Sequence, residues 1–449
     1  MKHVETICAL ASGPPPAALI VLRISGPACQ DFLYRHVKPT PKTPRRASLV
    51  HLIDQEGEVV DEGLCLWMPG PKSYTGEDTI ELTLHGGQAV LDHAMSVLMA
   101  HTDIRLAEPG EFTRRALESG SMDLTQAEAV ADLIDAESAG QKQQALRQMR
   151  GAIGDQYRDW RGQVLDLMVL AESVIDFPDE EDAPKRVDEP IKQGLQRLIR
   201  EFESALSDDF IGERIRSGFQ IAILGAPNAG KSTLLNRLAK REAAIVSDIA
   251  GTTRDTLEVR LKLSGQLVTL VDTAGLRDTS DPIEQEGIRR AYRASDEADL
   301  SIVLLNGRAE VATRSEPGST LFVWNKVDET GPDFDLVPDA EPGSIENPLT
   351  ISGMTGKGVD TLINYLESWL TNAASATESS VITRARHRES LVDSLAHLRR
   401  ALDRSSTSGV DEFVGEDLRL SARDLGCIIG DVGVEDVLGA IFSQFCIGK

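Results

Sequence analysis

The chain has 449 residues and carries 47 Lys and Arg against 71 Asp and Glu, a formal net charge of −24. Its average field repels phosphate polymers, which excludes a generally basic nucleic-acid-binding protein. The five cysteines include no C-x-x-C pair, which argues against a disulfide framework and a zinc site. No apolar run is long enough for a signal peptide or a bilayer span, so we predict a cytoplasmic protein with no membrane partner.

The N-terminal segment alternates short β-rich runs with turn signals. The runs ALIVLRIS at 18–25 and TIELTLHGG at 79–87 predict strands, and residues 87–102 predict a helix. This alternation is typical of a small α+β domain, which we expect to span residues 1–120.

Helical spacing dominates the next part of the chain. From Asp123 the sequence is nearly free of Gly and Pro and places apolar residues three to four apart, which predicts long helices. Asp123, with Gln126 three residues later, is a variant of the capping box. An acidic run at 175–186 interrupts this pattern, which resumes from about Glu189 to Ile215.

A different texture begins at Phe219, where apolar strand patterns alternate with helical ones up to about Leu370. The strand patterns are FQIAIL, LVTLVDTAG, LSIVLLN, TLFVWNKVD and PLTISGM. Runs that are apolar on both faces favour a mostly parallel sheet covered by helices on each side. The Ser, Ala and Thr-rich stretch at 371–380 predicts a linker, and helical spacing returns from Thr383.

The simplest domain plan is an α/β block inserted into a helical domain. We predict the α/β block at residues 217–372 and the two halves of the helical domain at 121–216 and 373–449. At about 150 residues per domain, the chain length is consistent with three domains.

The stretch GAPNAGKS at 225–232 fits the phosphate-loop pattern G-x-x-x-x-G-K-[ST] and lies between a predicted strand and a predicted helix. Backbone N–H groups of such a loop surround the phosphates, Lys231 reaches the outer phosphates, and the Ser232 hydroxyl ligates Mg²⁺. A simple glycine-rich turn is disfavoured because three further nucleotide-binding elements follow in order. The expected nucleotide contacts in this loop are Asn228, Ala229, Gly230, Lys231, Ser232 and Thr233.

The three further elements are DTAG at 272–275, NKVD at 325–328 and SGM at 352–354. Asp272 would support Mg²⁺, and the Gly275 N–H would sense the γ-phosphate. NKVD resembles the guanine-reading N-K-x-D of GTPases, whose carboxylate accepts hydrogen bonds that adenine cannot donate. SGM replaces the usual S-A-K and acts mainly through backbone N–H groups. The predicted contacts are Asp272, Thr273, Ala274, Gly275, Asn325, Lys326, Val327, Asp328, Ser352, Gly353 and Met354.

A fifth element, SDIAGTTRD, lies at 247–255 between the phosphate loop and DTAG. Thr253 is the candidate switch threonine, which would complete the Mg²⁺ shell and become ordered only with a γ-phosphate present. The alternative is a surface turn. The nucleotide contacts predicted here are Ser247, Asp248, Ile249, Ala250, Gly251, Thr252 and Thr253.

GAPNAGKS, IAGTTRD, DTAGLR and the C-terminal FCIGK together resemble the MnmE (TrmE) family of tRNA-modification GTPases, and the domain order fits along the whole chain. The resemblance implies an α/β Ras-like G domain inserted in a helical domain, preceded by an α+β folate-binding-like domain. It implies GTP as the nucleotide, with Ser232 and Thr253 at Mg²⁺.

Ras-like enzymes have a Gln after DTAG that orients the attacking water, but this chain has Leu276. In the MnmE family a K⁺ ion occupies the arginine-finger position and supplies positive charge to the transition state. The resemblance assigns this ion to Asn228, Ser247, Ile249 and Thr252. Because K⁺ also pairs two G domains in the family, we expect hydrolysis to rise with KCl more than with NaCl.

The resemblance assigns the catalytic role to Glu284, which would act through a bridging water once its loop orders. By sequence alone Glu286 is a close competitor, and the structural alternative is that both are solvated surface acids.

The family also binds a tetrahydrofolate derivative in the N-terminal domain, which forms the homodimer. The resemblance implies contacts from Arg23, Glu81, Ser121 and Lys449. Ser121 stands where the family often has Lys, and the turn SGPPPAAL is stiffer than the usual glycine-rich turn. The alternative for Arg23 is a strand-end salt bridge. Cys446 is a possible reactive thiol near Lys449, although such a cysteine more often simply packs.

The implied function is GTP-driven tRNA modification. Together with an FAD-dependent partner resembling MnmG, in a heterotetramer or larger assembly, the chain would install a (carboxymethyl)aminomethyl group at C5 of the wobble uridine, U34, of certain tRNAs. The alternative is a ribosome-assembly GTPase of the Era or EngA type, but the sequence lacks the KH-like basic segment that this type predicts after its G domain. A dynamin-like membrane scaffold is unsupported, because no amphipathic basic helix is present.

Overall fold

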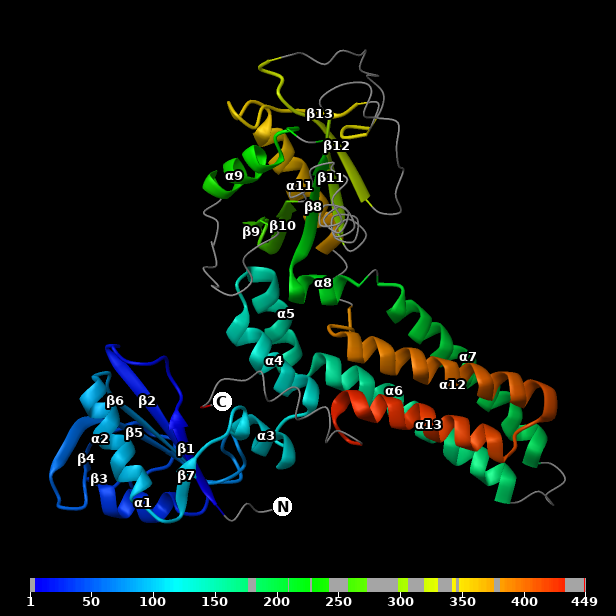
Figure 1. Cartoon of the computed structure of the whole chain (residues 1–449). Helices are drawn as coiled ribbons and strands as arrows, with labels where there is room; N and C mark the ends of the chain where they lie inside the picture. Colours follow the sequence, from blue (N-terminus) through cyan, green and yellow to red (C-terminus); the bar gives the residue numbers. More distant parts are fainter. Residues whose placement is uncertain are drawn as a thin grey trace, which may run out of the picture. The chain divides into compact units, whose positions relative to one another are not determined.

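A computed structural model describes residues 5–176, 183–208, 210–226, 228–241, 257–272, 298–305, 319–329, 341–344, 347–374, 380–432 and 448. The chain divides into two compact units. Unit 1 contains residues 1–131, 147–199 and 390–449, and unit 2 contains residues 132–146 and 200–389. Figure 1 shows their elements coloured along the sequence.

An α+β domain begins unit 1. Its seven-stranded sheet has the order β3-β4-β5-β6-β2-β1-β7 and is antiparallel except for the parallel pair β1 and β7. The strands are β1 (Thr6–Leu10), β2 (Leu19–Ser25), β3 (Val37–Lys38), β4 (Ser48–Ile53), β5 (Val59–Met68), β6 (Thr79–His85) and β7 (Ile104–Leu106). The helices are α1 (Cys29–His36), α2 (Gln88–Met99) and α3 (Glu111–Glu118). The strands predicted at 18–25 and 79–87 and the helix at 87–102 are confirmed as β2, β6 and α2.

The core of this domain follows the period of two in β2. Ile20, Leu22 and Ile24 are fully buried and pack with residues of α1 and α2. Side chains that alternate across a strand allow one face to be apolar while the other carries polar groups. Arg23 therefore lies on the opposite face of β2 from this core.

A buried ion network joins α3 to strand β7 and to the loop before β6. The Glu111 carboxylate is only 2 % exposed and accepts hydrogen bonds from Arg115 Nη2 at 2.8 Å and Arg105 Nη2 at 2.7 Å. Arg115 is 1 % exposed and also pairs with Glu77 at 3.0 Å. Burial raises the pKa of Glu111, but bonds from Arg105, the Glu108 N–H and Arg115 outweigh this effect and lower the pKa from 4.5 to about 2.

The Glu111→Ala variant is expected to lose about 3 kcal/mol of stability, because it leaves the Arg115 charge buried with one partner fewer. Since folding lowers the pKa of Glu111, this stabilisation is present above pH 4.5 and disappears as the pH falls toward 2. Native-state hydrogen exchange in β1 and β7 at pH 7 measures the effect.

Glu108→Ala is the matched control, because the Glu108 ion pair with Arg114, at 3.0 Å, is exposed. It should cost less than about 1 kcal/mol. Equal losses in the two variants would contradict the importance of the buried network.

Long helices form where apolar residues recur three to four apart. They are α4 (Leu124–Asp135), α5 (Ala139–Met149), α6 (Ala152–Asp176), α7 (Ala183–Leu206), α12 (Ala385–Ser408) and α13 (Glu412–Ile429). The capping box of α4 is confirmed, since Gln126 N–H donates to Asp123 Oδ1 and Asp123 N–H donates to Gln126 Oε1, each at 2.9 Å. Helix α13 packs along α6 (Figure 1). Among the described residues, no helix is both long enough and apolar enough to cross a bilayer.

Helix α7 begins at Ala183, six residues before the predicted resumption near Glu189, and continues through Pro190. Residues 175–176 and 183–186 of the acidic run are therefore helical, contrary to the prediction. The backbone N–H that Pro190 lacks removes one intrahelical hydrogen bond, a cost that the packing of the longer helix outweighs.

Unit 2 contains the predicted, mostly parallel sheet, with the order β13-β12-β11-β8-β10-β9. Only β9 is antiparallel to its neighbour. The strands are β8 (Phe219–Gly225), β9 (Leu257–Leu263), β10 (Gln266–Asp272), β11 (Leu300–Leu305), β12 (Ser319–Trp324) and β13 (Leu349–Thr350). The helices are α8 (Ile211–Ser217), α9 (Lys231–Arg241) and α11 (Val359–Ala374).

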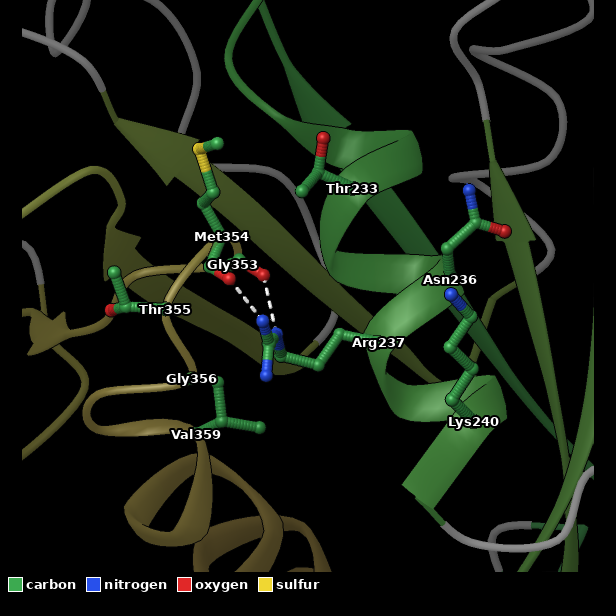
Figure 2. A pocket seen from close by; sticks show the side chains of 9 residues that line it. All are labelled: Thr233, Asn236, Arg237, Lys240, Gly353, Met354, Thr355, Gly356 and Val359. Atoms are coloured by element: carbon green, nitrogen blue, oxygen red, sulfur yellow. Dashed lines mark hydrogen bonds between the residues drawn. The ribbon is translucent and has the colours of Figure 1, made fainter.

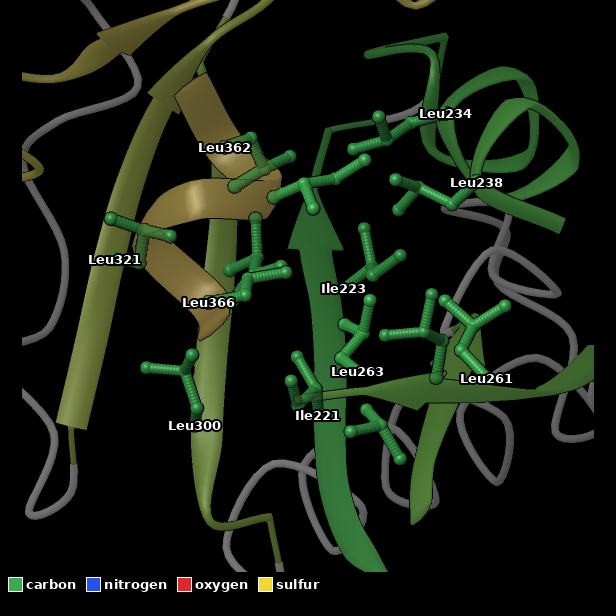
Figure 3. Packing of buried hydrophobic residues seen from close by; sticks show 14 of the residues in the cluster. Ile221, Ile223, Leu234, Leu238, Leu261, Leu263, Leu300, Leu321, Leu362 and Leu366 are labelled. Carbon is green, nitrogen blue, oxygen red and sulfur yellow. The ribbon is translucent and has the colours of Figure 1, made fainter. Parts of the chain in front are cut away.

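The core of this sheet contains Ile221 and Ile223 of β8, together with leucines from α9 and α11 (Figure 3). The helix α11 continues to Ala374, so the linker prediction is wrong for residues 371–374. Ala373 packs against this core, and the Thr371 hydroxyl donates to the Glu367 carbonyl at 2.7 Å, so the last turn of α11 is held in place.

The β9–β10 hairpin contacts the residues around the start of α5. The Gly140 N–H donates to the Gly265 carbonyl at 2.8 Å at the hairpin turn, and Arg260 of β9 pairs with Glu137 at 2.9 Å. At the other end of the hairpin, Leu257 is paired with Asp272.

Candidate functional site

The phosphate loop leaves the central strand β8 at Gly225 and enters α9 at Lys231. The φ angles of Gly225 and Gly230 are +146° and +92°. A Cβ on Gly225 would lie 2.7 Å from the Leu304 carbonyl oxygen, and one on Gly230 would lie 2.3 Å from Asn325 Nδ2. Both positions therefore require glycine. The loop lies at the carboxyl end of the sheet, where open α/β sheets bind their ligands.

The Lys231 ammonium is held inside this loop. Its Nζ donates to the carbonyls of Gly225 at 2.7 Å and Ala226 at 3.0 Å, and the side chain is buried. Asn228 is exposed, and its φ of 65° lies in the left-handed region, which asparagine tolerates. Ser232 and Thr233 follow in the first turn of α9, and the amino end of a helix favours an anion.

Asn325 joins the phosphate loop to the SGM loop. Its side chain is 3 % exposed, donates from Nδ2 to the Ala229 carbonyl at 2.7 Å and accepts at Oδ1 from the Gly353 N–H at 3.0 Å. The sequence motif identifies Asn325 as part of a base-reading element, and the structure adds that it bridges two loops.

The Asp328 carboxylate lies beside Ser352. A hydrogen bond from the Ser352 hydroxyl lowers the pKa of Asp328, and a backbone N–H and nearby Lys326 lower it further. The Val327 N–H donates to the Ile351 carbonyl at 3.2 Å, which links the NKVD loop to the residue before SGM. These contacts favour the ionised form of the Asp328 carboxylate, which can only accept hydrogen bonds.

A cavity of about 600 Å³ lies between α9 and the loop 353–356 (Figure 2). Thr233, Arg237 and Lys240 of α9 border it, as does Met354, whose side chain is mostly exposed. Arg237 is the residue in this region that sequence reasoning missed. Its only sequence signal is a cation on the polar side of an amphipathic helix, which usually indicates a solvated surface.

Several predicted site residues lie outside the described part of the chain. For Asp272 the structure describes only the backbone, which ends β10 and pairs with Ile223 of β8. The predicted residues outside the described ranges are Ser247, Asp248, Ile249, Ala250, Gly251, Thr252, Thr253, Thr273, Ala274, Gly275, Glu284, Glu286, Cys446 and Lys449. Their roles remain predictions.

Arg23 and Glu81 are direct cross-strand neighbours on β2 and β6. Arg23 Nε donates to Glu81 Oε1 at 2.9 Å, and the guanidinium lies 5.3 Å from the ring centre of Tyr74 and 5.6 Å from that of Phe112. A salt bridge therefore exists, but it lies within the strands and not at a strand end. Ser121 bonds instead to the Ser119 hydroxyl at 2.9 Å, and the structure does not join it to this pair.

The described residue of the C-terminal motif, Gly448, packs against β1. Its φ is +104°, and an added Cβ would lie 2.1 Å from the Leu10 carbonyl oxygen. Leu10 follows Ala9, whose cross-strand partner is Arg23. Gly448 therefore lies against the strand that pairs with β2 at Arg23.

Three cysteines are small buried residues of the N-terminal domain. Cys8, Cys29 and Cys65 are fully buried, and burial raises the pKa of Cys8 and of Cys65 to about 12. A raised pKa keeps the thiol protonated and unreactive. Cys427 is half-buried.

Two family models cover nearly the whole chain. The model described as "GTP-binding protein TrmE N-terminus" matches residues 6–121, and the model described as "MnmE helical domain" matches residues 124–446. The first match contains the seven-stranded sheet with Arg23 and Glu81, and the second contains the nucleotide loops.

Curated relatives extend over the full length. A protein from Hyphomonas neptunium called "tRNA modification GTPase MnmE" is 51% identical over 447 residues, which cover 99% of each chain. A protein of the same name from Parvibaculum lavamentivorans is 48% identical over 451 residues, covering 99% of this chain and 100% of that one. The chain therefore belongs to the MnmE family of tRNA modification GTPases.

Proposed function

We propose that the chain acts in the cytoplasm with an FAD-dependent, MnmG-like partner, in a heterotetramer or larger assembly. This assembly would install a (carboxymethyl)aminomethyl group at C5 of U34 in certain tRNAs. The supporting observation is a second polar site, the Arg23–Glu81 pair, in a different unit from the nucleotide loops. A GTPase switch alone needs no such site, whereas a one-carbon transfer needs a place for the carbon donor.

For GTP hydrolysis, the residues within the described ranges fit the predicted ions. Ser232 is the second residue of α9, after Lys231, and its hydroxyl would hold Mg²⁺ together with Thr253. The Asn228 amide is exposed and makes no hydrogen bond within the described chain, so its oxygen is available to K⁺ together with Ser247, Ile249 and Thr252. The bound K⁺ would supply positive charge at the γ-phosphate. Leu276 is apolar and cannot take over the task of the usual glutamine, which is to orient the attacking water.

Replacing NaCl by KCl at equal ionic strength is expected to raise kcat for GTP hydrolysis about tenfold, because a well-placed charge acts on the transition state. Asn228→Ala should reduce this difference to near unity while GDP binding is retained. Steady-state phosphate release measures both effects. Equal rates in potassium, sodium and caesium would contradict the proposed ion.

The Arg23–Glu81 pair fits a folate. Arg23 uses Nε for Glu81, and its two terminal nitrogens make no hydrogen bond within the described residues, so they remain available for a carboxylate of the glutamate tail. The Glu81 carboxylate suits the amino and ring N–H edge of a pterin. We assign Ser121, Lys449 and the thiol of Cys446 to the same proposed site, with homodimerisation through this domain.

Gly448→Ala is expected to weaken tetrahydrofolate binding about tenfold, because strain at a positive φ and contact with Leu10 displace the chain end. GTP hydrolysis should be unaffected. Gly409→Ala is the matched control, since Gly409 also has a positive φ, +82°, but an added Cβ meets nothing within 4 Å. Equilibrium dialysis with labelled folate measures the difference. Unchanged binding in Gly448→Ala would separate the C-terminal motif from the folate site.

Analysis of the wobble base tests the whole proposal. In tRNA from a strain lacking this protein, the modification at C5 of U34 should disappear, and expression of the wild-type chain should restore it. An Arg23→Ala variant should fail to restore it while retaining GTPase activity. Unmodified U34 is expected only if the proposal holds, and unchanged modification in the deletion strain would favour an Era-type ribosome-assembly role. The net charge of −24 is compatible with tRNA contacts made largely by the partner.

A further inference from the structure

Arg237 makes two bonds to the SGM loop that the nucleotide motifs do not account for. Its Nε donates to the Gly353 carbonyl at 2.5 Å, and its Nη2 donates to the Met354 carbonyl. Figure 2 shows the guanidinium reaching from α9 to both carbonyl oxygens. One planar fork thus holds two successive carbonyl groups.

These bonds fix the direction of a peptide group. In a trans peptide the C=O and the N–H of the same unit point in opposite directions. When the Gly353 carbonyl points to Arg237, the N–H of Met354 must point away from α9. The next peptide is fixed in the same way, and its Thr355 N–H donates to the Ser352 hydroxyl at 3.0 Å.

The loop is shaped to leave room for this fork. Gly356 has a φ of +89°, and an added Cβ would lie 2.7 Å from Arg237 Nη1. The Gly356 N–H donates to the Ser352 carbonyl at 2.8 Å, which closes the turn over the guanidinium. The Gly353 N–H already donates to Asn325, so the Met354 N–H is the next donor along the loop.

We propose that Arg237 is a positioning residue for base recognition. By holding the Gly353 and Met354 carbonyls, it orients the Met354 N–H to donate to the 6-oxo group of guanine. This inference rests on the proposed role of residues 352–354 in contacting the base. Asp328 reads the opposite side of the same edge, the ring N–H and the 2-amino group. Arg237 therefore acts on one position of the base and leaves the other unchanged.

Equilibrium binding of three nucleotides to the full-length protein tests the two positions of the base one at a time. GDP has all the groups, 6-thioguanosine diphosphate replaces the 6-oxo oxygen by sulfur, a weaker acceptor, and inosine diphosphate lacks the 2-amino group. In the wild type we expect both analogues to bind about tenfold more weakly than GDP, the loss expected for about one hydrogen bond.

In Arg237→Met, GDP and inosine diphosphate should both bind about tenfold more weakly, while 6-thioguanosine diphosphate changes little. The dissociation constant of 6-thioguanosine diphosphate divided by that of GDP, the thio ratio, therefore falls toward one. The dissociation constant of inosine diphosphate divided by that of GDP is preserved. Arg237→Lys keeps the charge but loses the fork, so it should lower the thio ratio in the same way. Arg419→Ala removes an exposed arginine of α13, paired with Glu416, and should leave all three affinities unchanged.

These ratios do not depend on the fraction of folded protein, so a destabilised variant remains informative. A wild-type thio ratio retained in both Arg237 variants would overturn the assignment of Arg237, while base reading by the loop would stand. A wild type that binds GDP and 6-thioguanosine diphosphate equally would instead overturn base recognition by residues 352–354, and the Arg237 assignment with it.

Discussion

Asp328→Asn is expected to weaken GDP binding about a thousandfold and to transfer the preference of the site to xanthosine diphosphate. In the proposed role the ionised carboxylate would accept from the ring N–H and the 2-amino group of guanine, and an asparagine amide turns one acceptor into a donor. A polar mismatch of this kind gives strong discrimination. The 2-oxo group of xanthine accepts from the new donor, so the xanthine nucleotide should bind more tightly to the variant than to the wild type.

Competition between the two nucleotides, measured by titration calorimetry, decides the outcome. Because the Ser352 hydroxyl lowers the pKa of Asp328, the carboxylate remains ionised throughout the range from pH 8 down to 5. GDP affinity in the wild type should therefore be flat over this range. Equal GDP affinities in variant and wild type, or a loss of GDP affinity below pH 6, would contradict base reading by Asp328.

Glu284→Ala is expected to lower kcat for GTP hydrolysis about a thousandfold, because on the proposed mechanism it removes the group that would orient and deprotonate the attacking water. Leu276, which follows DTAG, cannot perform this task. Nucleotide affinity should be preserved, since the base acts only on the water. Glu286→Ala is the matched comparison, because it removes the same charge two residues further along the chain.

Single-turnover hydrolysis in KCl measures the chemical step without product release. If Glu286→Ala loses the activity and Glu284→Ala keeps it, the assignment belongs to Glu286. If both retain full activity, neither carboxylate is the base, and the proposed mechanism at the γ-phosphate is wrong.

The sequence was sufficient for the parts of the fold that local chemistry dictates. Asp123 and Gln126 form the predicted capping box because both partners lie within one turn. The phosphate loop lies between β8 and α9 because Gly225 and Gly230 require backbone conformations that other residues avoid. The mostly parallel sheet followed from strand runs that are apolar on both faces.

Contacts between distant segments were not predictable in the same way. Arg237 and Met354 are 117 residues apart, and nothing in the spacing of α9 indicates a bond to a loop carbonyl. The bridging role of Asn325 also depends on two loops meeting in space, although the residue itself belongs to a recognisable motif. Helix α11 extends beyond its predicted end because Ala373 packs against apolar residues of the core. Tertiary packing here stabilises a segment whose local sequence favours a helix only weakly.

The β9–β10 hairpin has a mechanical consequence. Its strands are paired without interruption from the turn at Gly265, which is bonded to Gly140, to the pair of Leu257 and Asp272. Along its other edge β10 is paired with β8 from Val268 to Asp272, so the same strand is held on both sides up to the point where DTAG begins. The hairpin therefore forms a continuous, doubly paired connection between the strand end at Asp272 and the first turn of α5.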